Sequence, residues 1–341
     1  MKRNLLILSL LFLLLLGFFI ADLFFGSVHI PVKNIVQALL SGNSGKEEWN
    51  LIILDFRFPK AITAIVAGIA LSVSGLQMQT MFRNPLAGPD ILGISSGASL
   101  GVAFVILGFS SLFGFHNGDV LSNWIIVLAA WLGAGTVLLL IFLVSLRIND
   151  IMTILILGIL FGSVSLAIVS ILQYFSNEIL LKSFLVWSMG SLSNVSGSHL
   201  AVLLPSIGIG LLLSLLTVKM LNLLLLGENY AKSMGLNVNL SRFLIFLSTS
   251  ILAGSITAFC GPIAFIGIIV PHLCRMIFKT SDQKILLAGS VLVGAFLMLL
   301  SDLLSQLPGN GVILPINTVT ALLGIPVVIW IIFRNQRISS I

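Results

Sequence analysis

The stretch RNPLAGPDILGISSGASLG, residues 83–101, lies between two long apolar runs of the chain. Its Asn-Pro pair at 84–85 and its Gly-Pro pair at 88–89 are typical of turns, because proline disfavours a helical conformation at the residue before it. Glycines at four-residue spacing, which allows helices to approach closely in lipid, follow the turn: Gly93, Gly97 and Gly101. The stretch therefore predicts a short turn between two membrane helices, the second of which packs tightly against a neighbour.

The composition is that of a membrane protein. Of the 341 residues, 58% are hydrophobic and 8% are charged, whereas soluble domains average about 45–50% apolar and about 25% charged residues. Apolar blocks recur along the whole chain, each close to the roughly 20 residues that a helix needs to cross a bilayer. Because backbone polar groups cannot stay unpaired in lipid, we expect an all-α polytopic membrane protein with one transmembrane domain over residues 1–341.

Charge predicts how these blocks cross the membrane. The ten candidate spans are 5–25, 61–82, 91–109, 121–146, 151–175, 199–221, 241–259, 263–279, 285–304 and 313–333. If they alternate in direction, 12 of the 17 Lys and Arg residues fall on the side of the termini and 5 on the other side. Basic residues accumulate in cytoplasmic loops. We therefore expect about ten transmembrane helices with both termini in the cytoplasm.

The same reasoning assigns the net charge and the N-terminus. The charge of +6 indicates membrane topology and contact with anionic lipid headgroups, and no nucleic-acid partner is expected. Residues 1–20 resemble a signal peptide, but the apolar run continues to Phe25 and shows no small-residue cleavage site near Gly26. We interpret this segment as an uncleaved first span.

The chain lacks the residues of several other functions. Its acidic residues near spans lie at span ends, which argues against a proton or sodium relay: Asp22, Asp90, Glu178 and Asp302. A G-x-x-x-x-G-K-[ST] phosphate loop is missing, since SGNSGKEE at 41–48 has the wrong spacing. No histidine has a carboxylate partner at helical spacing. The chain is therefore not expected to be an enzyme, to hydrolyse ATP or to bind a metal.

Four stretches of the chain carry a family resemblance. They are RFPKAITAIVAGIALSVSGLQMQTMFRNPLAGPDILGISSGA, which begins at residue 57, LLLLGENYAKSMGL at 223–236, CGPIAFIGIIVPHLCR at 260–275, and LPINTVTALLGIPVVIW at 314–330. Together they resemble the permease subunits of ATP-binding-cassette importers for ferric siderophores, haem and cobalamin, the FecCD-like or BtuC-like family. The resemblance covers nearly the whole chain.

The resemblance implies a complete transport system. Its fold would be the BtuC-like permease fold of type II ABC importers, with a second permease subunit, identical or homologous, around a central pathway. Two cytoplasmic ABC ATPase subunits would use ATP and Mg, while this chain itself would bind no cofactor. A periplasmic or lipid-anchored substrate-binding protein would dock on the outer face. The location would be the bacterial inner membrane.

Candidate gate residues come from the same resemblance. The RNPL turn would lie near the cytoplasmic mouth of the pathway, together with the start of the fifth span. The candidates are Asn84, Pro85, Leu86, Ile151 and Met152. An ordinary tight turn is the alternative for the first three.

Residues 222–242 form the longest cytoplasmic loop of this topology. Gly235 is a typical residue for helix termination and tolerates positive φ, so the segment predicts a short helix followed by a turn. The resemblance implies that it couples to the ATPase through Gly227, Glu228, Ala231, Met234 and Gly235. A solvated interfacial helix, which would suit Lys232 and Arg242, is the alternative.

Basic residues before the second span suggest a docking site for the binding protein. Arg57 and Lys60 bracket Pro59, and the resemblance implies that they pair with glutamates of that protein; simple interfacial anchoring is the alternative. Three positions depart from the family pattern, which usually has arginine, glutamate and glycine there: Gln306, Ile313 and Asn317. A third docking charge therefore stays open.

Two other functions stay open beside ABC import. An ion-coupled secondary transporter or a channel could have the same number of spans, and an intramembrane scaffold would transport nothing. The sequence also leaves open whether the substrate is a siderophore, haem or cobalamin, because the walls of such a pathway are expected to be apolar and permissive.

Overall fold

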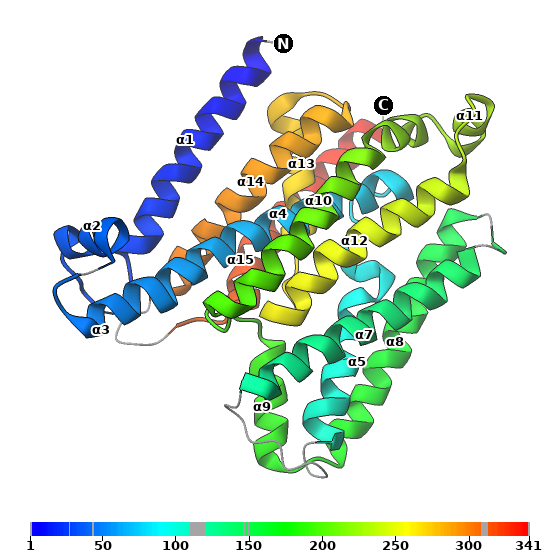
Figure 1. Cartoon of the computed structure of the whole chain (residues 1–341). Helices are drawn as coiled ribbons and strands as arrows, with labels where there is room; N and C mark the ends of the chain where they lie inside the picture. Colours follow the sequence, from blue (N-terminus) through cyan, green and yellow to red (C-terminus); the bar gives the residue numbers. More distant parts are fainter. Residues whose placement is uncertain are drawn as a thin grey trace.

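The computed structural model describes residues 2–26, 28–42, 44–109, 120–145, 147–148, 150–307 and 313–339. Throughout these ranges the regular secondary structure is helical. Figure 1 shows two groups of long helices, one built around α4 and the other formed by α5, α7 and α8. The predicted all-α fold class is therefore confirmed.

The helices of the first half of the chain have the following bounds: α1 (Lys2–Phe24), α2 (Val32–Ser41), α3 (Glu47–Asn50), a π-helical stretch (Leu51–Arg57), α4 (Phe58–Phe82), a 3₁₀ turn (Pro89–Leu92), α5 (Ile94–Ala103), a second π-helical stretch (Phe104–Phe109), α7 (Val120–Ser145) and α8 (Ile151–Tyr174). Those of the second half are α9 (Glu178–Ser188), α10 (Gly197–Leu225), α11 (Glu228–Ser233), α12 (Val238–Cys260), α13 (Ile266–Phe278), α14 (Gln283–Ser305) and α15 (Ile316–Ser339).

Each of the ten predicted spans falls on an apolar helix. In the described part of the chain, seven helices are long and apolar enough to cross a membrane: Arg3–Phe24, Glu47–Phe82, Trp124–Ser145, Ile151–Tyr174, Gly197–Leu225, Val238–Cys260 and Gln283–Ser305. The remaining three predicted spans correspond to the shorter apolar helices Ile94–Gly108, Ile266–Phe278 and Ile316–Trp330. The count of ten crossings therefore stays a prediction.

Helix α4 forms the centre of the larger group. It packs against α10, α12, α13 and α14, and almost all of its side chains are buried. Glycine makes the closest of these approaches possible: a Cβ atom at Gly68 would lie 2.1 Å from the carbonyl oxygen of Gly294, and one at Gly75 would lie 1.8 Å from that of Gly267. Backbones this close leave no space for a side chain.

Buried polar groups fix the register of α4 against α10 and α12. The Nε2 atom of Gln77 lies 3.2 Å from Oγ1 of Thr217 and 3.1 Å from Oγ of Ser248, while Oγ1 of Thr249 donates to Oε1 of Gln77 at 3.0 Å. All four side chains are buried. Because a buried amide is costly unless it is hydrogen-bonded, this arrangement favours one packing of the three helices.

The predicted glycine stripe packs the smaller group together. A Cβ atom at Gly97 would lie 2.6 Å from the carbonyl oxygen of Gly133 in α7, and one at Gly101 would lie 2.0 Å from that of Ala129. Gly93 has φ +70° and contacts the backbone of α8 at Gly158 and Gly162. The prediction of close packing is thus confirmed, but the helix begins at Ile94 and not at residue 91, because the left-handed Gly93 separates it from the preceding 3₁₀ turn.

Candidate gate and coupling site

The RNPL turn is closed by its own backbone and by one side chain. Arg83 ends α4 in the left-handed conformation, with φ 49°. The side chain of Asn84 then accepts a hydrogen bond from the N–H of Leu86 at 2.9 Å, and the Ala87 N–H donates to the Asn84 carbonyl at 3.0 Å. An asparagine that binds the backbone two residues ahead is a standard turn device. The turn predicted from the Asn84-Pro85 pair is therefore present, and the side chain of Asn84 stabilises it.

The start of α8 is held by its N-terminal cap. Asp150 accepts hydrogen bonds from the backbone N–H and the hydroxyl of Thr153, at 2.9 and 2.6 Å. These bonds, the hydroxyl above all, lower the pKa of the Asp150 carboxyl from its ordinary value, and Arg242 lowers it further. A carboxylate at this position suits the positive end of the helix dipole. Ile151 and Met152 follow directly and are fixed by this cap.

A recess of about 530 Å³ lies where α4, α8, α10 and α11 meet. Ile151 and Met152 line it together with Gly227 and Glu228 of the predicted coupling segment. Arg83 lines it as well, whereas its neighbours Asn84, Pro85 and Leu86 are not among the lining residues. The structure therefore brings two of the five candidate gate residues together with two of the predicted coupling residues, and places the other three gate candidates in the adjacent turn.

The predicted coupling helix is present as α11. It starts after Gly227, which has φ 119°, and it is followed by Gly235 with φ 84°, so both ends use conformations that favour glycine. The N–H of Gly235 donates to the Lys232 carbonyl at 2.9 Å. Ala231 is fully buried, whereas Met234 is 57% exposed. The helix thus has one face attached to the bundle and one face open to a partner.

Two arginines attach this segment to the helices beside it. Arg242, only 2% exposed, forms a 2.7 Å ion pair with Glu228 and donates to the Ile148 carbonyl at 3.4 Å. Arg83 donates to the Leu224 carbonyl at 2.9 Å. The burial of Arg242 does not suit the alternative of a solvated interfacial helix. Its partner in α11 lies 14 residues earlier in the chain, and a local pattern does not reveal that pair.

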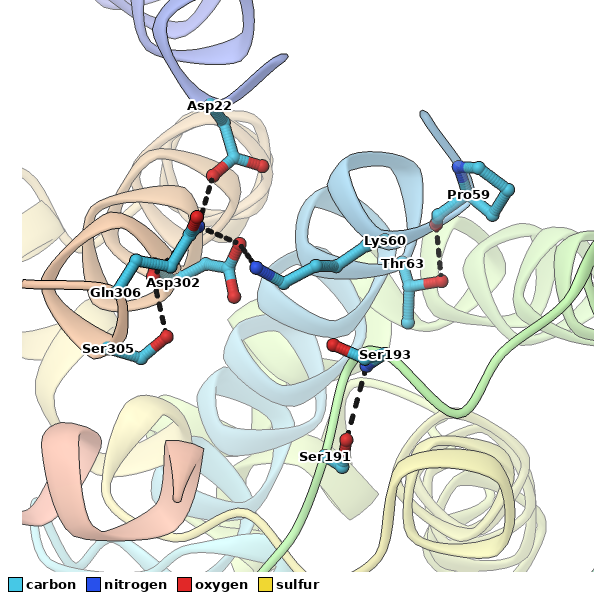
Figure 2. A network of polar contacts seen from close by, with 9 residues as sticks. All are labelled: Asp22, Pro59, Lys60, Thr63, Ser191, Ser193, Asp302, Ser305 and Gln306. Atoms are coloured by element: carbon cyan, nitrogen blue, oxygen red, sulfur yellow. Dashed lines mark hydrogen bonds and ion pairs between the residues drawn. The ribbon is translucent and has the colours of Figure 1, made fainter. Parts of the chain in front are cut away.

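At the other end of the bundle, Lys60 lies in an ionic network that joins three helices (Figure 2). Its ammonium is 2.7 Å from Asp302 of α14. Gln306 donates to Asp302 at 3.3 Å and to Asp22 of α1 at 3.4 Å. Asp22 and Asp302 are both buried. Lys60 thus already has a strong partner inside the chain.

Arg57 is directed inward as well. Its guanidinium donates to the carbonyls of Leu23, Phe24 and Val28, the last by a very short bond, and the residue is 8% exposed. Docking of a binding protein by Arg57 and Lys60 stays a prediction, and it would require Arg57 to leave these carbonyls. What the structure does show is that both residues tie the end of α1 and the segment after it to α4 and α14.

Positions that depart from the family pattern have structural roles or lie on the surface. The side chain of Asn317 accepts a hydrogen bond from the N–H of Ala264 at 3.1 Å, in the loop before α13. This bond supports a backbone in which Phe265 has φ 70°. Gln306 belongs to the ionic network described above, whereas Ile313 is 51% exposed. Asn317 and Gln306 thus form hydrogen bonds that stabilise this end of the bundle.

The arrangement of apolar helices around a recess with a short appended helix is that of a multi-pass membrane transport subunit. The model of the FecCD transport family matches residues 13–334. Among curated relatives, the hemin transport system permease protein HmuU of Yersinia pestis is 36% identical over 331 residues, which are 96% of this chain and 97% of that protein. The vitamin B12 import system permease protein BtuC of Photorhabdus laumondii is 37% identical over 290 residues, 84% of this chain and 83% of that one.

A solved structure is similar over almost the full length. It is described as an inward-facing conformation of a metal-chelate type ABC transporter, and it matches with a TM-score of 0.82 and 31% identity over 96% of this chain and 99% of that chain. The chain therefore belongs to the FecCD transport family. It is a permease of an ABC importer, a transport subunit and not an enzyme.

Proposed function

We propose that this chain is the transmembrane permease of an importer that moves an iron-siderophore, haem or cobalamin across the bacterial inner membrane by alternating access. A separate pair of cytoplasmic ATPase subunits, using ATP and Mg, would drive the change. A second permease subunit would complete the pathway, and a periplasmic or lipid-anchored binding protein would deliver the substrate. Both termini would be cytoplasmic, because 12 of the 17 Lys and Arg residues lie on the side of the termini and basic residues accumulate in cytoplasmic loops.

The observation that carries this proposal is the shared recess of the coupling and gate residues. Gly227 and Glu228, at the start of α11, face the same 530 Å³ recess as Ile151 and Met152, at the start of α8. A shift of α11 therefore changes the surroundings of the first turn of α8. Because packed helices tend to occupy discrete arrangements, such a shift is expected to select between two positions of α8.

The contacts of α11 would allow it to transmit a movement to α8 and α12. Its Glu228 is bound to the buried Arg242, the fifth residue of α12, while Met234 and Tyr230 are 57% and 53% exposed. These two exposed, largely apolar side chains offer a contact surface to a protein that binds at the membrane surface, such as the ATPase. A push on this surface would reach α12 through the ion pair and α8 through the recess.

A proline at Gly235 tests this function. Gly235 needs φ 84° and donates its N–H to Lys232, whereas proline has φ near −65° and no N–H. We expect Gly235→Pro to abolish uptake and to release the ATPase in co-purification from cells that express the neighbouring transport genes. Gly42→Pro is the matched control, since Gly42 also has φ 71° and a capping N–H bond but ends α2 at the other end of the bundle. If Gly235→Pro retains ATPase and uptake, α11 is not the coupling helix.

The alternative of an ion-coupled secondary transporter or channel has its own discriminating measurement. Uptake is measured with the ATPase gene disabled and with the membrane proton gradient collapsed. We expect the first change to stop uptake and the second to leave it largely intact; the opposite pair of results would support secondary transport. Growth of a deletion strain on each metal source then separates siderophore, haem and cobalamin.

A further inference from the structure

A pocket of about 360 Å³ opens at the end of the bundle opposite α11. It lies where α7, α9, α10 and α12 come together, and its walls include Val127, Lys182, Trp187, His199 and Phe259. Most of this surface is aromatic or aliphatic. Its polar groups are few, which makes the position of each one informative.

His199 presents a buried hydrogen-bond donor there. The residue is 7% exposed, and its Nδ1 atom accepts from the backbone N–H of Ser196 at 3.4 Å in a capping box at the start of α10. Because a backbone N–H can only donate, Nδ1 is the acceptor and the ring proton of the neutral imidazole is on Nε2. In the described part of the chain Nε2 has no hydrogen-bond partner of good geometry, although the ring also interacts with the backbone of Asn194.

The ring cannot easily turn away from this position. Trp124 and Phe259 pack edge-on against the imidazole, with centroid distances of 5.1 and 5.7 Å. A buried donor that is held in place without an acceptor is unfavourable. An acceptor atom brought into the pocket by a ligand would remove that cost.

The charge around the pocket favours an anionic acceptor. Lys182, on α9, lines the pocket and is exposed. The N-terminus of α10, the positive end of a 29-residue helix, adjoins it. Among the described lining residues none is acidic. A phosphate or carboxylate oxygen therefore fits both the donor and the local charge.

A second, apolar cavity lies further along α7, α10 and α12, and together with the pocket it forms a candidate groove. This cavity of about 380 Å³ follows one turn further along α7 and α12, lined by residues that include Trp131, Leu138, Ile209 and Ile251. Its floor is α12, which packs against both α7 and α10. From Val127 to Leu138 the helix rises about 16 Å, which is close to half of the roughly 30 Å thickness of a bilayer core.

We propose that this groove binds one anionic phospholipid. A phosphate oxygen accepts the Nε2 hydrogen bond of His199 and pairs with Lys182, and an acyl chain lies between α7 and α10 on the surface of α12. The combination of an anion-binding pocket at the membrane surface and an apolar groove of one-leaflet depth matches a lipid better than a soluble anion. The bound lipid would hold α9, which carries Lys182 and Trp187, against the ends of α10 and α12.

Native mass spectrometry of the full-length chain tests the headgroup. The purified chain is incubated with equal amounts of phosphatidylglycerol and phosphatidylcholine. We expect one retained phosphatidylglycerol, with affinity reduced about tenfold or more in His199→Asn and in Lys182→Gln. Asparagine keeps an acceptor for the Ser196 N–H but lacks the Nε2 donor. Lys33→Gln, at an exposed lysine of α2, should bind as the parent chain does. Equal retention by all four proteins would overturn the proposal.

A second pair of variants tests the groove. Gly135 lines the groove and has no atom within 4 Å of an added Cβ, so Gly135→Leu directs a larger side chain into the groove without crowding at its Cβ. We expect this change to lower phosphatidylglycerol retention with His199 and Lys182 intact. Gly17→Leu, at an equally open glycine of α1, is the control. If inorganic phosphate binds with the same dependence on His199 and Lys182 while Gly135→Leu changes nothing, the ligand is a dissolved anion and the lipid proposal is wrong.

Discussion

Replacing Gly101 by alanine should separate α5 from α7. The added Cβ would lie 2.0 Å from the Ala129 carbonyl oxygen, whereas real Cβ atoms essentially never come closer than 3.0 Å to a heavy atom outside their own residue and its chain neighbours. The backbones must therefore move apart by at least 1.0 Å. That shift also loosens the contact between Gly97 and Gly133 one turn away. Forced displacement of a packed interface costs about 1–3 kcal/mol, so we expect the free energy of unfolding to fall by about that amount.

The assay is steric-trap unfolding of the full-length chain in bicelles. Gly208→Ala is the matched control, because Gly208 is also helical but has no neighbour within 4 Å of a Cβ. There, alanine should stabilise the helix by roughly 0.5–1 kcal/mol, since it restricts the unfolded chain more than glycine does. Equal stability of the two variants would refute the reasoning, because it would show that the glycine contact is not tight.

Three further changes have defined expectations. Gln77→Leu should lower the free energy of unfolding by about 1–3 kcal/mol, because three buried hydroxyls lose their amide partner. Thermal unfolding in detergent measures this change, and an unchanged unfolding midpoint would contradict the prediction. Glu228→Gln should leave the chain folded but lower the stimulation of ATPase activity by substrate, since the ion pair with Arg242 is lost; full stimulation in a reconstituted complex would argue against a role of α11 in transmitting movement. Lys60→Met should lower the free energy of unfolding of the chain by about 3–5 kcal/mol, because it leaves the buried Asp302 without its ion-pair partner. The double variant Lys60→Met/Asp302→Leu should regain much of this stability. If the losses of the two single variants simply add in the double variant, the two residues are not coupled.

Local patterns predicted the helices and several of their ends. Apolar length located all ten candidate spans, and the glycine spacing at 97 and 101 predicted a close helix contact. Gly235 was expected to take positive φ and does so. These features depend on residues that are neighbours along the chain, so one sequence is enough to find them.

Contacts between distant residues were not visible in the same way. Lys60 and Asp302 are 242 positions apart in the chain, and nothing in the spacing of either residue indicates the other. The docking role expected for Arg57 came from the family resemblance and stays a prediction, whereas the bonds of its guanidinium to backbone carbonyls 29 to 34 residues earlier could not be seen in the sequence. Phe265 adopts positive φ, which a non-glycine residue seldom does. Such features require the packed structure.

The burial of α4 bears on how the chain is made. Its polar partners in later helices lie 140 to 242 residues further along the sequence. During synthesis this helix enters the membrane long before α10, α12, α13 and α14 exist, so Gln77 and Gln79 first face lipid or the insertion machinery. The insertion machinery must therefore keep the polar side chains of α4 out of lipid until the second half of the protein has been synthesised. If translation stopped after α8, the helices that bury α4 would be missing.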